Sequence, residues 1–222
     1  MKKIALTLFF FGILFSVALI LTSCNGGLLA PPPSSNTAPP STPSSLEEEK
    51  ALIREYCIGG DVVVRWPDGD IGVYDATGNP NIRIAIQRAL NEWNAVIKSG
   101  GGKTRFRLSN DPNSPVKIFY DPNYDGCAYN EDTENGYEIT SFEIGISTND
   151  EWCGFPDNYY AIFLKNFGIM VGIKGEKMCP ASLQDGSCPY DAWTQYTSIF
   201  DIHKKVVRAL YKVPPGYYVG IE

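Results

Sequence analysis

Histidine is nearly absent from this sequence. His203 is the only histidine in the 222 residues, so a metal centre built from three imidazoles cannot be assembled in any register. Basic residues are fewer than acidic ones, and the formal net charge is −6. An acidic chain is a poor partner for nucleic acid and for anionic lipid surfaces. The chain also has no GxSxG nucleophile elbow, which counts against a Ser-His-Asp hydrolase.

Long hydrophobic runs are confined to the start of the chain. Lys2 and Lys3 precede an apolar run over residues 4–21, a pattern typical of an export signal. Residues 21–23 and Cys24 resemble the lipobox of bacterial lipoproteins. An uncleaved membrane anchor is the alternative, because the run is almost long enough to span a bilayer.

The lipobox resemblance implies that residues 1–23 are a signal peptide and that Cys24 is lipidated. The protein would then be extracytoplasmic in a bacterial cell envelope, held to the membrane through its N-terminal lipid. Cleavage removes two lysines and no acid, which lowers the formal net charge from −6 to −8. Residues 24–45 are rich in Pro, Ser and Thr and are expected to form an extended tether. Residues 46–222 suit a single domain with a sizeable core.

Five cysteines follow Cys24, and export favours disulfides among them. Cys179 and Cys188 enclose a short loop and are the first predicted pair. Cys127 with Cys153 is the second. Cys57 could replace a partner in either pair or stay a free thiol, and the sequence alone does not fix the connectivity.

The pattern of apolar residues predicts an α/β (α+β) fold, with a mixed twisted sheet of about five strands and three main helices. A short helix is expected at residues 45–56, opened by a capping-box pattern. The main helices are expected over residues 82–97, 158–171 and 199–211. The strands are expected at residues 61–65, 71–74, 104–108, 116–120 and 139–147.

The helix that begins after Asn158 has two different faces. One face carries an apolar stripe at helical spacing, typical of packing on a core: Tyr160, Phe163, Leu164, Phe167 and Val171. The opposite face carries Ile162, Lys165, Asn166 and Ile169. Gly172 is expected to end the helix.

The order of the landmarks from Arg65 to Gly216 resembles the matrixin branch of the metzincin zinc metalloproteases. RWPDGDIGVYD looks like the opening strand, IQRALNEWNAV and TRFRL like the first helix and the next strand, and VKIFYDP like a further sheet strand. Met178 stands where the Met-turn would be, and IFDIHKKVVRALY looks like the closing helix. Gly168 and Gly172 fit the glycines of the HExGHxxGxxH form of the signature. The resemblance implies a metzincin-like fold.

The functional residues of that signature are missing. With Gly172 on the motif's glycine, Lys165 takes the place of the first His, Asn166 that of the Glu, Ile169 that of the second His and Gly175 that of the third. Ile169 and Gly175 offer no lone pair to a metal, and Lys165 would place an ammonium there. Asn166 cannot take a proton from water. The resemblance therefore implies a degenerate site without catalysis.

Other chemistry has weaker support. His203, beside two lysines in the last predicted helix, is expected to be a solvated surface residue. A zinc site combining it with cysteines, or a cysteine protease using Cys57, stays an alternative. Glu143 and Asp150 could form an acid/base pair, although acidic residues on such a chain are usually solvated.

One stretch has the spacing of a calcium loop. Asp121, Asn123 and Asp125 precede Gly126, with Asp132 at the twelfth place, as in the D-x-N-x-D-G pattern. The twelfth residue is Asp rather than Glu, and strands flank the stretch, so a polar Asx-turn loop is the alternative. Matrixin-like domains often carry structural calcium in loops of this region. Calcium is the only cofactor that the sequence suggests.

Together these observations predict a lipid-anchored, extracytoplasmic domain that has lost catalysis and whose cleft binds a peptide or a protein segment. An active zinc-dependent or other hydrolase is the first alternative. A structural envelope lipoprotein with a filled cleft is the second, since Ile169 could collapse into the former metal position.

Overall fold

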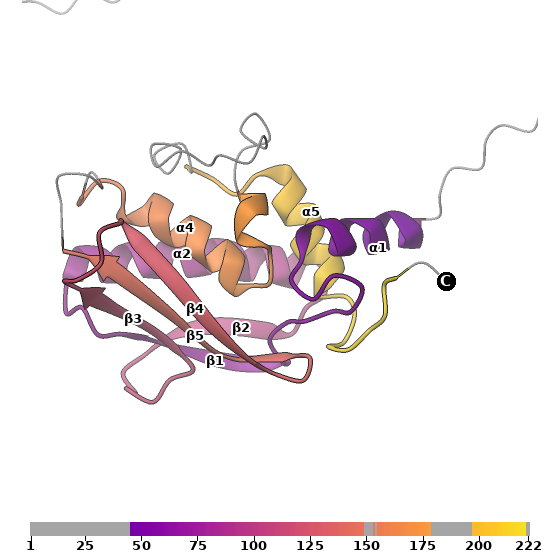
Figure 1. Cartoon of the computed structure of the whole chain (residues 1–222), viewed down its shortest axis with the longest axis horizontal. Coiled ribbons are helices and arrows are strands. Elements are labelled where there is room, and N and C mark those ends of the chain that lie inside the picture. Colours follow the sequence, from indigo (N-terminus) through magenta and orange to yellow (C-terminus); the bar gives the residue numbers. More distant parts are fainter. Residues whose placement is uncertain (1–44, 149–152, 154, 179–196, 221–222) are drawn as a thin grey trace, which may run out of the picture. The chain divides into compact units, whose positions relative to one another are not determined.

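A five-stranded mixed sheet forms the base of the fold, in the order β2-β1-β3-β5-β4 (Figure 1). The strands β2, β1, β3 and β5 run parallel, and β4 pairs with β5 in the antiparallel direction. The strands are β1 (Gly69–Asp75), β2 (Thr104–Ser109), β3 (Val116–Asp121), β4 (Ala128–Asn135) and β5 (Glu138–Ser147). This architecture confirms the mixed α/β fold class.

The structure is a computed structural model that describes residues 45–148, 153, 155–178 and 197–220. The described residues belong to one compact unit, Thr42–Glu222. The predicted signal peptide, Cys24, most of the tether, Asp150 and the Cys179–Cys188 pair lie outside the described residues. Within those residues, no helix is both long enough and apolar enough to cross a membrane.

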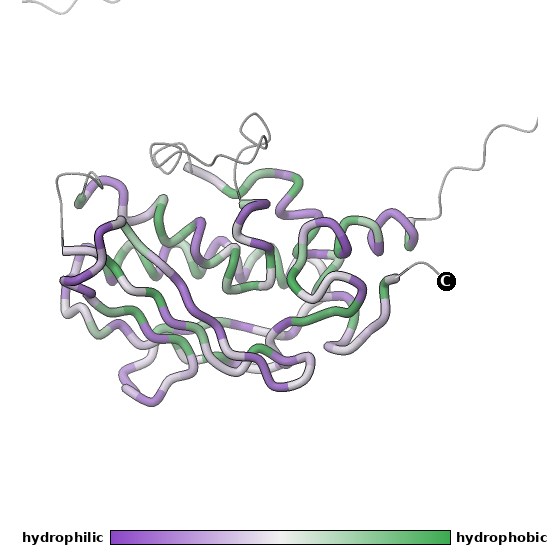
Figure 2. Tube along the Cα trace, viewed as in Figure 1, coloured by the Kyte–Doolittle hydropathy of each residue, from purple (hydrophilic) through white to green (hydrophobic). Residues whose placement is uncertain are grey.

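One strand prediction was wrong, and one strand was missed. Residues 61–65 are extended but form no strand: isolated bridges join Val62 to Tyr218 and Arg65 to Glu138. Strand β4, in contrast, was not expected, because its sequence AYNEDTEN is polar after Ala128 and shows no apolar alternation. It forms at the edge of the sheet, where only one neighbour is needed and most of its side chains stay in water. Figure 2 shows most of the β4 tube in purple.

The helices lie on one face of the sheet (Figure 1). They are α1 (Ser45–Tyr56), α2 (Pro80–Ser99), α4 (Tyr159–Met170) and α5 (Asp201–Leu210), with a short 3-10 turn η1 (Gly175–Met178) between α4 and α5. Helix α2 begins two residues before the predicted start: the Asn79 side chain accepts a hydrogen bond from the Asn81 N–H, and Pro80 occupies the first turn. The apolar residues at helical spacing along it are all buried: Ile82, Ile86, Ala89, Leu90, Trp93, Val96 and Ile97.

Two tryptophans connect α4 to the rest of the core. The Trp93 indole N–H donates to the Leu164 carbonyl at 2.8 Å, and the Trp66 indole N–H donates to the Met170 carbonyl at 2.8 Å. Both indoles are fully buried and both donors are satisfied. Helix α4 is therefore held in a fixed position relative to α2 and to the segment that leads into β1.

Candidate functional site

Helix α4 is buried on nearly all sides. Asn158 precedes it as predicted, and Gly172 follows the C-cap residue Val171 with φ of +110°, which favours glycine. The face opposite the apolar stripe is buried as well: Ile162 and Asn166, on that face, are 1% and 0% exposed. Figure 2 shows this helix as mostly green. A helix that is apolar almost all round packs against neighbours on both sides, here α2 and the end of β4.

Asn166, at the position of the motif's glutamate, is held by two hydrogen bonds. Its side-chain amide donates to the Ile162 carbonyl at 2.9 Å, and its side-chain oxygen accepts from the Asn130 amide of β4 at 2.9 Å. The side chain is fully buried. An amide engaged in this way has no basic group to offer to a water molecule.

The two positions of the missing second and third histidines face each other. A Cβ placed on Gly175 would lie 3.6 Å from the Cδ1 atom of Ile169. The turn at Gly172 produces this approach, because its N–H bonds to the Ile169 carbonyl at 2.8 Å and the chain then reverses into η1. Ile169 is partly buried and packs against the hydrophobic core. The side chains that converge here are apolar or absent, so they form no metal-ligand set.

Lys165, at the position of the first histidine, is mostly buried. Burial lowers the pKa of its ammonium group to about 8, because the charged form loses hydration. A lysine in this state carries a positive charge at neutral pH, which opposes the binding of a cation next to it.

Met178 lies directly under α4. A Cβ on Gly168 would be 2.1 Å from the Met178 Cε atom, so a larger residue there would force the Met178 side chain to move. Met178 itself is fully buried. The landmark methionine and the helix glycine, which the resemblance placed in the same region, are therefore in direct contact.

His203 is not on the surface, and the prediction that it is solvated was wrong. It is 1% exposed, and its Nε2 atom lies 2.9 Å from the Lys177 carbonyl oxygen, so Nε2 carries a proton and donates it. Burial lowers the pKa of this imidazole, partly offset by the hydrogen bond to Lys177. His203 thereby ties η1 to α5. Its position before Lys204 and Lys205 suggested solvent, but η1 covers it.

The other chemical alternatives receive no structural support in the described residues. Cys57 is fully buried, and burial raises the pKa of its thiol to about 12, which disfavours the reactive thiolate. Glu143 lies on β5 and pairs with Lys117 at 3.9 Å. Across residues 45–148, 155–178 and 197–220, no group of three or more His, Cys, Asp or Glu side chains is arranged to hold a metal.

The predicted calcium residues are divided between a turn and a strand. Asp121 ends β3, and its carboxylate accepts from the Asn123 N–H at 2.9 Å and from the Tyr129 hydroxyl at 3.1 Å. The first bond closes an Asx turn. Asp132 lies inside β4 opposite Phe142, and Asp125 lies in the intervening loop.

One of the two predicted disulfides lies among the described residues. Cys127 and Cys153 are bonded, with Cα atoms 5.3 Å apart. The bond connects the start of β4 to the segment before α4, since Cys127 precedes Ala128 and the Asn158 side chain donates to the Cys153 carbonyl at 3.1 Å. Together with the Asn130–Asn166 pair, it fixes α4 relative to the sheet edge.

Asn130 is the residue of this site that the sequence did not reveal. It is separated from its partner by 36 positions and lies in a strand without an apolar pattern. Only the Asn-Gly dipeptide at Asn135 and Gly136, where Gly136 has φ of +65°, signals the hairpin that brings β4 against β5.

Comparisons with known proteins find a distant structural likeness and no matching family model. No protein-family model matches the chain, and no curated protein matches it. Two solved structures of myroilysin, a metzincin-type metalloprotease, are similar at 18% identity each. Their TM-scores are 0.37 and 0.34; the alignments cover 52% and 55% of this chain and 54% and 55% of those chains. The chain thus spans about half the length of the structures it matches, and a likeness of this size does not decide its family.

Proposed function

We propose that this protein is a lipid-anchored, extracytoplasmic protein whose metzincin-like, matrixin-type domain has lost zinc and catalysis and binds a peptide or protein segment. The observation that carries the proposal is the state of Asn166, which is buried and bonded to Ile162 and Asn130 where a protease of this type needs its general base. The contact of Ile169 with the Gly175 position supports it, because the places of two metal ligands hold no donor atom.

The order of the elements supports the metzincin part of the proposal. The opening strand, the first helix, the two following strands, the glycine-containing helix, the Met178 turn and the closing helix occur in the order that the resemblance implied. The contact between Gly168 and Met178 adds a three-dimensional relationship to this order.

Strand β4 is the element best placed to bind a segment of another protein. It is the last strand of the sheet, and no described strand pairs with its outer edge. Backbone groups on such an edge can pair with an added strand. Glu131, Asp132 and Glu134 are exposed on β4, so we infer that a cationic segment is preferred.

Two other functions are alternatives to this proposal. A structural envelope lipoprotein is favoured by the way Ile169 fills the space next to Gly175. An active zinc-dependent or other hydrolase would need ligands that the described residues do not assemble. The open edge of β4 favours binding over a purely structural role.

Zinc analysis and a peptidase assay test the loss of catalysis. The purified protein, dialysed against trace zinc, should retain no stoichiometric metal and should not cleave a fluorogenic peptide library with or without chelator. Asn166→Glu alone should stay inactive, because no metal-bound water is present for the new carboxylate to activate. The matched variant replaces Lys165, Ile169 and Gly175 by His together with Asn166→Glu, and it is designed to restore the zinc ligands and the general base. Chelator-sensitive cleavage by the unaltered protein would contradict the proposal and favour an active zinc-dependent hydrolase.

Hydrogen exchange tests peptide binding. A peptide selected from a random library should be basic and should slow amide exchange along β4, while β2 at the other edge keeps its rates. Protection at β2 alone, or selection of acidic peptides, would contradict binding along β4.

The lipid anchor is tested at the N-terminus. Mass spectrometry of the membrane-extracted protein should find Cys24 as a lipidated first residue, and Cys24→Ala should remain unprocessed. Recovery of an intact Met1 peptide from the wild type would contradict the anchor.

A further inference from the structure

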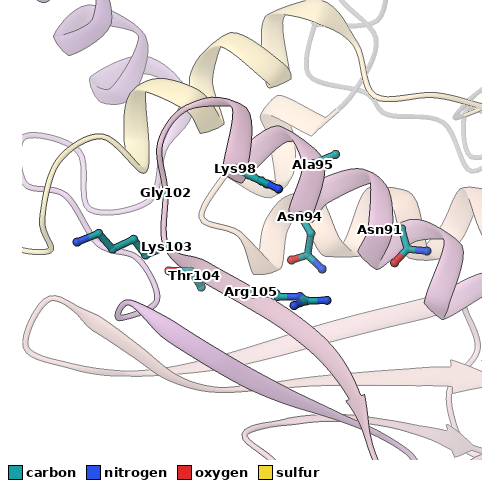
Figure 3. Close-up of a pocket in the computed structure, with 8 residues that line it drawn as sticks. All are labelled: Asn91, Asn94, Ala95, Lys98, Gly102, Lys103, Thr104 and Arg105. Carbon is teal, nitrogen blue, oxygen red and sulfur yellow. The ribbon is translucent and has the colours of Figure 1, made fainter.

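A cationic cavity lies between α2 and β2, at the sheet edge opposite β4 (Figure 3). It has a volume of about 500 Å³, enough for a small organic molecule. Figure 3 shows the Arg105 side chain lying along β2 below Asn94, with Lys98 on the helix above and Lys103 extending outward from the loop. No acidic side chain is among the described residues that line it.

The charges of this cavity are not neutralised by the protein. Lys98, Lys103 and Arg105 make no hydrogen bond or ion pair with any described residue. Among the other basic residues that the structure describes, only Lys205 also lacks such a bond. Asp70, beside Arg105 in the strand register, pairs instead with Arg107. Three uncompensated cations around one cavity are unexpected on a chain of net charge −6.

The walls of the cavity are held in place by hydrogen bonds between a helix side chain and the backbone of β2. Asn94 binds both polar groups of Phe106 on β2: its amide donates to the carbonyl at 2.8 Å, and its oxygen accepts from the N–H at 2.9 Å. The strand below and the helix above are thus fixed relative to each other. A cavity with fixed walls loses little entropy when a ligand enters.

The glycine loop between α2 and β2 does not itself provide an anion site. The N–H groups of Gly100, Gly101 and Gly102 all bond to carbonyls of the last turn of α2, at 3.1, 3.0 and 3.0 Å. Recognition of an anion must therefore come from the guanidinium and ammonium groups. A guanidinium fork matches phosphate oxygens in a bidentate manner, and two ammonium groups add charge that a dianion can balance.

We propose that this cavity binds a phosphorylated sugar or polyol, with the phosphate held by Arg105 and Lys98 and the hydroxyl groups near Asn91. The ligand is either a free phosphomonoester or the phosphodiester headgroup of a lipid or envelope polymer. The cavity exceeds the volume of a bare phosphate, and its amide side chains suit hydroxyl groups better than an acyl chain. This site is separate from α4 and does not depend on the function proposed above.

Calorimetric titration of the purified full-length protein tests the proposal. Glycerol 3-phosphate represents the monoester, glycerophosphoglycerol the diester, and inorganic phosphate the bare ion. We expect saturable binding of one of the two glycerol compounds, tighter than that of inorganic phosphate and weakened by salt. Preference for the monoester identifies a soluble ligand, and preference for the diester identifies a headgroup.

Matched variants distinguish a site from general charge attraction. Arg105→Gln and Lys98→Gln should each weaken binding at least about tenfold. Lys205→Gln removes the same charge from another unpartnered lysine and should leave binding unchanged. All three side chains are exposed, so the melting temperatures should stay equal. Equal weakening by Lys205→Gln, equal affinity for inorganic phosphate, equal binding of a polyglutamate peptide, or absence of saturation would each overturn the proposal.

Discussion

The side chain of Asn130 donates a hydrogen bond of 2.9 Å to the side chain of Asn166 and thereby joins the edge strand β4 to helix α4. This bond lies at the position that the sequence resemblance to the metzincin signature gives to its general base, and both partners are amides. The polar pair has a structural role here, since it satisfies a fully buried side chain.

Asn130→Ala should lower the free energy of unfolding by about 1 to 3 kcal/mol, because the buried oxygen of Asn166 loses its donor. Urea denaturation measures the change. Thr133→Ala, at an exposed position inside the same strand, is the control and should be nearly neutral. A double-mutant cycle with Asn166→Ala should show coupling between the two positions, and additive effects would contradict a direct bond.

Lys165 should make the stability of the protein depend on pH in the alkaline range. Its pKa is about 8 in the folded protein and near 10.5 when unfolded. Between these values the unfolded chain holds a proton that the folded chain lacks, so the free energy of unfolding rises as the pH increases.

Lys165→Met should remove this rise and stabilise the protein at neutral pH by about 1 to 3 kcal/mol, since no ammonium has to be buried. Urea denaturation at neutral and alkaline pH measures both effects. Lys205→Met, at an exposed position, is the control and should leave the pH dependence as it is. A destabilised Lys165→Met variant with the same alkaline slope would contradict the prediction.

His203 should titrate below the ordinary histidine range, because burial lowers its pKa. It is the only histidine in the chain, so its imidazole signal in a proton NMR titration of an untagged protein needs no assignment. Below pH 6.5 the unfolded chain gains a proton before the folded chain does, and stability is lost as the pH falls. His203→Gln should flatten that acid slope. A measured pKa at or above 6.5 would show that the ring is accessible.

The calcium prediction for Asp121, Asn123, Asp125 and Asp132 can be tested by melting experiments. Millimolar calcium should raise the melting temperature if the loop binds the ion, because binding to the native state alone stabilises it. Asp125→Ala should abolish the rise. The Asx turn between Asp121 and Asn123 needs no ion. An unchanged melting curve in the parent protein would therefore show that this loop is a polar turn that does not bind calcium.

Most helices and four strands could be predicted because their apolar residues repeat with a clear period. Helix α2 shows this best, with its cap at Asn79 and its end at Gly100. Strand β4 could not be predicted in this way, since an edge strand with a solvated outer half needs no apolar alternation. Residues 61–65 have the right composition for a strand, but they contact two different segments, one near Tyr218 and one at Glu138, and make only isolated bridges with each.

The residue types at the candidate site could be read from the sequence, but their surroundings could not. The prediction that Lys165, Asn166 and Ile169 provide no zinc-ligand set depends on residue type alone. The sequence could not show that Asn166 is buried, because its partner Asn130 comes from a distant strand. The burial of His203 had the same cause, since η1 covers a side chain that its neighbours in sequence place in solvent.

The bond of Asn94 to Phe106 also makes the two rims of the sheet unequal. The polar backbone groups in the middle of β2 are occupied by Asn94, whereas β4 has no described strand beyond it. A sheet with two free rims can add copies without limit and grow into fibres. Because Asn94 interrupts pairing at β2, a strand is expected to add along β4 alone, and such assembly ends with one added segment instead of propagating through the sheet.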